Sequence, residues 1–146
     1  MTSRFSRLMA IAVLPVLAAF SVGAYAADGP QHKVVFQVST GDAGTQNLVL
    51  NNVANLQKHY GMDNVDIVVV AYGPGLSILT KQSKEAKRVE SLALQNITFD
   101  ACHNTMEGIK RKTGKMPVLL EGVKVVPAGV AQIVELQEKG YAYVRP

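Results

Sequence analysis

The stretch Ile97–Glu107, with the sequence ITFDACHNTME, predicts a strand that runs into a helix. β-Branched and aromatic residues in its first three positions are typical of a strand. Asn104 and Glu107 are spaced like a helix N-cap and the carboxylate that answers it, and the helical run ends at Gly114, a typical C-cap. The stretch also contains Cys102, the single cysteine of the chain. We therefore expect this thiol in a turn just before a helix.

The rest of the chain repeats the alternation of strand and helix. Apolar runs typical of buried strands occur at His32–Ser39, Val65–Ala71, Val123–Val126 and Tyr141–Arg145. Apolar residues at helical spacing lie between them, in runs that begin near Thr45, Ser83, Asn104 and Pro127. This order predicts an α/β fold, a three-layer α/β/α sandwich around a parallel five-stranded sheet. Helices should cover both faces of the sheet, because the crossovers are right-handed.

Loops that follow the strands supply a candidate binding pocket. The carboxyl ends of parallel strands meet at one edge of the sheet, where functional groups gather. The candidate residues around Cys102 are Asp42, Tyr72, Gly73, His103 and Asn104. The turn Tyr72–Gly75 lacks both the GxGxxG pattern and the P-loop lysine. A tight turn is therefore the simpler interpretation, and a cradle for an anion is the alternative.

The position of Cys102 allows two interpretations. Backbone N–H groups at a helix start favour an anion, so a thiol there loses its proton more easily and becomes a nucleophile. Asp100 would oppose this, and His103, as the next residue along the chain, need not point towards the thiol. A small, buried and inert cysteine is also common. The residues alone leave both interpretations open.

The first 26 residues have the pattern of a secretory signal peptide. Arg4 and Arg7 precede the apolar run Leu8–Phe20, and Ala24–Ala26 is a small-x-small cleavage site. We expect cleavage after Ala26, export to the periplasm and no stable membrane insertion afterwards. Residues 27–146 then form one domain of 120 residues.

Charge and cysteine content exclude several classes of protein. Removing the leader lowers the formal net charge from +4 to +2, which gives no case for nucleic-acid binding. A single cysteine makes no internal disulfide, and the chain has no CxxC motif for zinc or for thioredoxin-type redox chemistry.

Three segments together resemble the DsrE/DsrF-like family of small α/β sulfur carriers: Val69–Gly75, Phe99–Met106, and Val125–Val130 with Glu135–Tyr143. The resemblance implies a five-stranded, mainly parallel sheet and assembly into trimers or hexamers. It also implies that the cysteine at position 102 accepts sulfur as a persulfide. Such a protein is at most a sulfurtransferase-like carrier without independent turnover. It needs no cofactor or metal, and its partners are thiol-bearing donor or acceptor proteins.

Two other functions remain open from the sequence. The first is a non-catalytic periplasmic oligomeric protein for binding or assembly, in which the cysteine is structural. The second, a flavodoxin-like binder of flavin or nucleotide, is allowed by the topology, but no phosphate-loop signature supports it.

Overall fold

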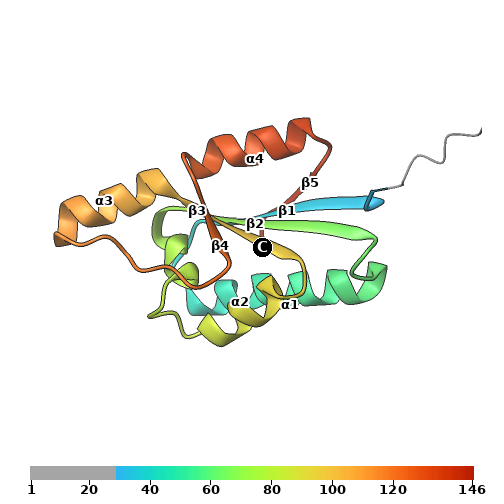
Figure 1. The fold of residues 1–146 in the computed structure, drawn as a ribbon, viewed down its shortest axis with the longest axis horizontal. Helices are drawn as coiled ribbons and strands as arrows, with labels where there is room; N and C mark the ends of the chain where they lie inside the picture. The colour runs from blue at the N-terminus through green and yellow to red at the C-terminus, as the bar shows by residue number, and fades with distance from the viewer. Residues whose placement is uncertain (1–28) are drawn as a thin grey trace, which may run out of the picture.

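The computed structural model describes residues 29–146, so the expected signal peptide lies outside the described part of the chain. Five parallel strands form one sheet in the order β4-β3-β2-β1-β5 (Figure 1). The strands are β1 His32–Val38, β2 Val65–Ala71, β3 Ile97–Cys102, β4 Val123–Val126 and β5 Ala142–Val144. The predicted α/β fold with a parallel five-stranded sheet is confirmed.

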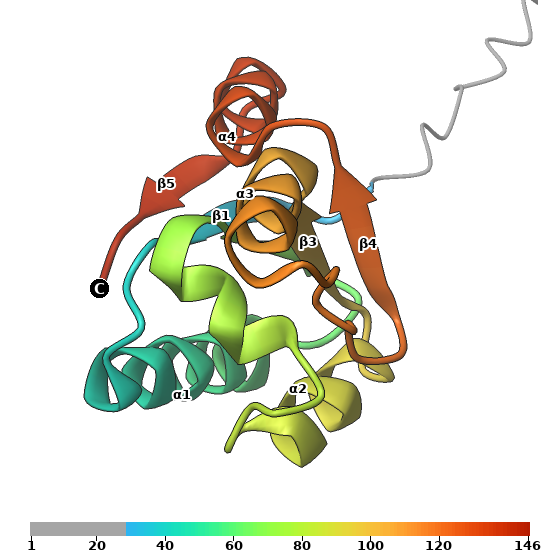
Figure 2. The ribbon, with the colours of Figure 1, turned by 90° about the vertical axis from the view of Figure 1, so that its left-hand side faces the viewer.

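Helices cover the two faces of the sheet unequally. They are α1 Ala43–Tyr60, the 3-10 helix η1 Gly73–Leu79, α2 Ala86–Ala93, α3 His103–Thr113 and α4 Gly129–Glu138. Helices α1 and α2 lie on one face and α4 lies on the other, while α3 projects beyond the ends of the strands (Figures 1 and 2). Within residues 29–146, no helix is long and apolar enough to cross a membrane.

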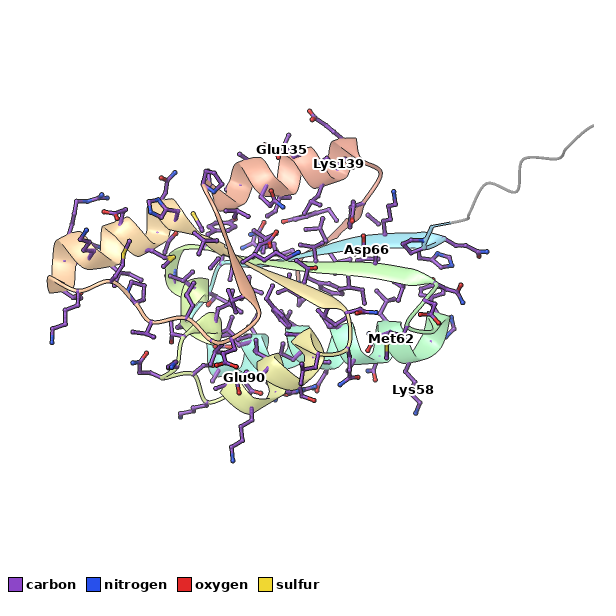
Figure 3. The ribbon with its side chains drawn as sticks, viewed as in Figure 1. Lys58, Met62, Asp66, Glu90, Glu135 and Lys139 are labelled. Atoms are coloured by element: carbon purple, nitrogen blue, oxygen red, sulfur yellow. The ribbon has the colours of Figure 1, made fainter. Side chains whose placement is uncertain are left out.

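Side chains alternate along the strands and form two cores. The larger core lies between the sheet and α1, η1 and α2, and it contains Phe36, Ile67, Val69 and Phe99. The smaller core lies under α4, where Ile133 and Leu136 pack on Val35, Val68 and Val70. Figure 3 shows Asp66 of β2 on the α4 side, and Lys58 and Met62 on the side of α1. The α4 face carries the candidate site.

Helix α1 begins earlier than the sequence pattern indicates. Asp42 is its N-cap: its Oδ2 accepts hydrogen bonds from the backbone N of Thr45 at 2.7 Å and from the Thr45 hydroxyl at 2.9 Å. The hydrogen bond from the Thr45 backbone lowers the pKa of Asp42, followed by that from the Thr45 side chain. Thr45 as N-cap is therefore wrong, because the carboxylate upstream takes the free N–H groups. Gly61 ends the helix as predicted, with φ of 89°.

Helix α3 follows β3 without a loop. Cys102, the last residue of β3, is the N-cap, with φ of −70° and ψ of 115°. Asn104 as N-cap is therefore wrong, because the strand continues directly into the first helical turn. The predicted end is confirmed, since Gly114 has a left-handed φ of 77° and its N–H donates to the Lys110 carbonyl at 2.8 Å.

The starts of α2 and α4 also differ from the sequence pattern. Helix α2 begins at Ala86 rather than near Ser83, because residues 81–85 form turns first. Helix α4 begins at Gly129, with Ala128 as its N-cap, so Pro127 lies just outside the helix instead of in its first turn.

Candidate functional site

Cys102 is buried at the carboxyl end of β3, where 5% of its surface is exposed. It pairs with Val126 of the neighbouring strand β4. The alternation of side chains puts Cys102 on the same face as Asp100, which bonds to α4. The thiol therefore lies between the sheet and the beginning of α4, as well as at the beginning of α3.

The first turn of α4 comes unusually close to the thiol. A methyl group on Gly129 would lie 3.0 Å from Cβ of Tyr72 and 3.2 Å from Cβ of Cys102. These separations are too short for an unstrained contact, so the absence of a side chain at Gly129 allows this approach. The N–H of Asn104 in α3 also donates to the carbonyl of Pro127 at 3.3 Å. The N-termini of α3 and α4 thus meet around Cys102.

Thr105 links the thiol to the loop after β2. The backbone N–H of Gly73 donates to Oγ1 of Thr105 at 2.9 Å. The Thr105 hydroxyl therefore keeps its own proton, which is available for donation to an ionised Cys102 sulfur. Thr105 is thus a donor that a thiolate at position 102 can use.

The pKa of Cys102 is lowered by these donors. Burial is the largest single influence and raises the pKa, but the Thr105 side chain and the backbone N–H groups of Gly129, Thr105 and Asn104 together outweigh it. Cys102 makes no side-chain capping bond as a neutral thiol, which is a weak acceptor. The ionised sulfur accepts more strongly, so the site favours the thiolate.

Replacing Thr105 by valine is expected to raise the pKa of Cys102 by about one pH unit. The change keeps the shape of the side chain but removes both its donor and the acceptor for the Gly73 N–H. A hydrogen bond to a charged group contributes about 1.5–3 kcal/mol. The rate of alkylation of the folded protein against pH measures this shift. Thr105→Ser restores a hydroxyl and should restore the midpoint. An unchanged midpoint of Cys102 alkylation in Thr105→Val would show that the Thr105 hydroxyl does not stabilise the thiolate.

Some of the predicted pocket residues lie close to Cys102, and others lie elsewhere. Tyr72 packs at Gly129, Gly73 bonds to Thr105, and Asn104 contributes its backbone N–H. The carboxylate of Asp42 instead caps α1. The exposed imidazole of His103 lies 3.8 Å from the carboxylate of Glu107, one helical turn further along α3.

The glycine-rich turn after β2 uses its N–H groups within the protein. Gly73 donates to Thr105, and Gly75 donates to the carbonyl of Tyr72 at 3.1 Å. A phosphate cradle needs such N–H groups to be free. The alternative of an anion cradle at these two groups is therefore not supported, and the turn is the start of η1.

Sequence reasoning missed Thr105 and Gly129. Thr105 occupies the third helical position after Cys102, a spacing at which an N-cap side chain meets the backbone N–H. The spacing of Cys102 and Thr105 could have indicated this contact, but placing the N-cap at Asn104 shifts the helical positions and obscures the spacing. Gly129 follows a different strand, and no local pattern connects it with the thiol.

A cleft of about 530 Å³ lies next to Thr105. Residues of η1, of α3 and of the segment after α3 line it, among them Gly73, Pro74, Thr105, Ile109, Lys112 and Pro117. Cys102 is not among the lining residues, so Thr105 is the group that touches both the thiol and the cleft. In the described range 29–146, no three His, Cys, Asp or Glu side chains group as a metal site.

The geometry defines a parallel α/β domain with one polarised thiol at a strand end. The model of the DsrE/DsrF-like family matches residues 32–146, so the chain belongs to this family. No match was found among the curated proteins.

Two solved structures share the fold. One, a protein of unknown function, MTH1491 from Methanobacterium thermoautotrophicum, is 37% identical with a TM-score of 0.71, and the match covers 79% of this chain and 99% of that one. The ychN protein from E. coli is 16% identical with a TM-score of 0.63 and the same two coverages. The second likeness shows the fold alone.

Proposed function

We propose that this protein is a thiol-based sulfur carrier that acts through Cys102. The observation that carries the proposal is the meeting of two helix N-termini and the Thr105 hydroxyl at one buried sulfur. These donors stabilise a thiolate, which is the nucleophile that a sulfur transfer requires. Membership of the DsrE/DsrF-like family supports sulfur relay as the chemistry.

The proposed transfer needs no change in overall oxidation state. The Cys102 thiolate attacks the outer sulfur of a donor R–S–SH, the donor S–S bond breaks, and R–S⁻ leaves with the electron pair and takes up a proton. Cys102 then carries –S–SH, which loses its proton to solvent. An acceptor thiolate attacks the outer sulfur of the reprotonated –S–SH in the same way, the S–S bond breaks, and the Cys102 thiolate leaves with the electron pair. The protein alone therefore moves sulfur between partners without consuming a cofactor.

A test on the unmodified mature protein addresses the proposal directly. After incubation with polysulfide, the intact mass should increase by one sulfur atom, about 32 Da, and a thiol reductant should reverse the increase. The midpoint of alkylation against pH should lie below the free-thiol value of about 8.5. A thiol with an ordinary midpoint and no sulfur adduct would reject the carrier function.

The location and partners belong to the same proposal. The pattern of residues 1–26 supports export to the periplasm, where a thiol-bearing protein would supply or accept the sulfur. Self-association into trimers or hexamers has support in the exposed Val130 and Val134 of α4, with 57% and 49% of their surfaces accessible. These two valines are one helical turn apart and form part of one face.

A second candidate is a non-catalytic periplasmic oligomeric protein for binding or assembly. The burial of Cys102 favours it, because a carrier must expose its sulfur to partners. The cleft beside Thr105, with Lys112 in its lining, offers a place for a small ligand. Under this alternative the native thiol resists alkylation at every pH at which the protein stays folded. Rapid labelling of the folded protein would exclude it.

A further inference from the structure

One polar contact joins α4 to β3 close to the thiol. Nε2 of Gln132 donates to Oδ2 of Asp100 at 2.8 Å, and Asp100 is buried with 2% of its surface exposed. Asp100 precedes Cys102 by two residues on β3, so both side chains lie on the same face of the sheet. Gln132 follows Gly129 by three residues, so the two share one face of α4. Asp100 and Cys102 on β3 therefore face Gln132 and Gly129 on α4, across the space between the sheet and the helix.

The apolar packing of α4 lies further along the helix. Ile133 and Leu136 hold it on the smaller core, whereas Gly129 has no side chain with which to hold the first turn. The first turn approaches the thiol closely at Gly129. Hydrogen bonds weaken steeply when the donor turns away from the acceptor, so a small tilt of this turn would weaken donation from the Gly129 N–H to an ionised Cys102 sulfur.

We propose that Gln132 is a positioning residue, whose hydrogen bond to Asp100 holds the first turn of α4 so that the Gly129 N–H points at the Cys102 sulfur. This inference rests on the proposed function in one respect: sulfur transfer is the reaction in which the aligned thiolate would act. The alignment itself is a property of the folded domain.

Two effects on the pKa of Cys102 must be separated, namely the charge of Asp100 and the position of the first turn of α4. Burial raises the pKa of Asp100, while the hydrogen bond from Gln132 and the charge of Lys124, its partner across β3 and β4, lower it. An ionised Asp100 would oppose the Cys102 thiolate by repulsion. Removing Gln132 alone would therefore change both the bond and the charge of Asp100.

The experiment therefore compares two variants that both lack this charge. Asp100→Asn keeps an oxygen that accepts from Gln132, and Asp100→Asn with Gln132→Met removes that bond by a nearly isosteric change. We expect the midpoint of Cys102 alkylation to be about 0.5–1 pH unit higher in the double variant. At a pH below both midpoints, its rate should be about 3- to 10-fold lower.

Gln137→Met is the matched control, because Gln137 is on the exposed side of the same helix. It should leave the midpoint unchanged. Hydrogen exchange of the Gly129 amide gives a second measurement, and it should be faster in the double variant than in Asp100→Asn. Thermal unfolding identifies the temperature range in which all variants are folded.

Equal alkylation midpoints and equal amide exchange in the two Asp100→Asn proteins would overturn the inference, since Gln132 would then only contribute to stability. This outcome is distinct from failure of the proposed function. The midpoint is measured with an alkylating reagent, so it responds to alignment whether or not the protein accepts sulfur.

Discussion

Replacement of Cys102 by serine is expected to abolish sulfur loading from polysulfide. The serine hydroxyl remains protonated at neutral pH and forms no persulfide, and the chain has no other cysteine to substitute for it. The fold should persist, because Cys102 is the N-cap of α3 and serine is a favoured residue there. Intact mass after polysulfide treatment should therefore show no added sulfur in a protein with a native circular dichroism spectrum. Wild type blocked by alkylation is the control and should behave in the same way.

The same variant tests the thiolate through stability. The pKa of Cys102 is lowered in the folded state, so the thiolate contributes stability above the unfolded pKa of about 8.5, and this contribution is lost as the pH falls through the folded value. Wild type should gain stability relative to Cys102→Ser as the pH rises through this interval. Denaturant unfolding at several pH values measures the difference. A constant difference, or sulfur loading in the serine variant, would contradict the assignment of Cys102.

Replacement of Gly75 by alanine is expected to have the largest effect on stability. The added methyl group would lie 2.1 Å from the carbonyl oxygen of Val38 and 2.5 Å from its carbon, both at the end of β1. These are backbone atoms, so no side-chain rotation relieves the overlap. The segment η1 also buries Leu76, Ile78 and Leu79 completely, and a shift of η1 would disturb the larger core.

We expect a loss of about 3 kcal/mol, at the upper end of the usual cost of overpacking, and a fall of roughly 10 °C in Tm. Gly108→Ala is the matched control. A methyl group at Gly108, within α3, would lie 3.7 Å from Nη2 of Arg111, an ordinary contact, and alanine is the better helix former. Its Tm should be equal to or higher than that of wild type. A Tm for Gly75→Ala within a few degrees of that of wild type would contradict this prediction, because it would show that η1 shifts with little loss of unfolding free energy.

The elements that the sequence predicted best are those with strong local patterns. The bounds of β2 are as predicted, because a continuous run of apolar residues buried on both faces has few alternatives. The helix starts depend on which side chain captures the free N–H groups, and the local pattern does not specify this. Asp42 captured them instead of Thr45, and the direct passage of β3 into α3 gave the cap position to Cys102 instead of Asn104.

The candidate site was predicted in its central residue and in three of its neighbours, Tyr72, Gly73 and Asn104. The sequence placed Cys102 at a helix start and at a strand end, which the structure shows. It did not indicate Gly129 or Gln132, because they reach the thiol through the packing of α4 on the sheet. It placed Asp42 and His103 in the pocket by sheet-edge topology, but capping and exposure direct their side chains elsewhere.

Most of the donors around Cys102 are main-chain groups, and this makes the site tolerant of sequence change. The N–H groups of Asn104, Thr105 and Gly129 remain in place whatever side chains stand at the exposed positions 103 and 104. Drift at these two positions would therefore alter the surface that a partner meets while leaving the acidity of the thiol intact. Under the proposed function, such changes would alter the choice of partner while the thiol keeps the same surroundings.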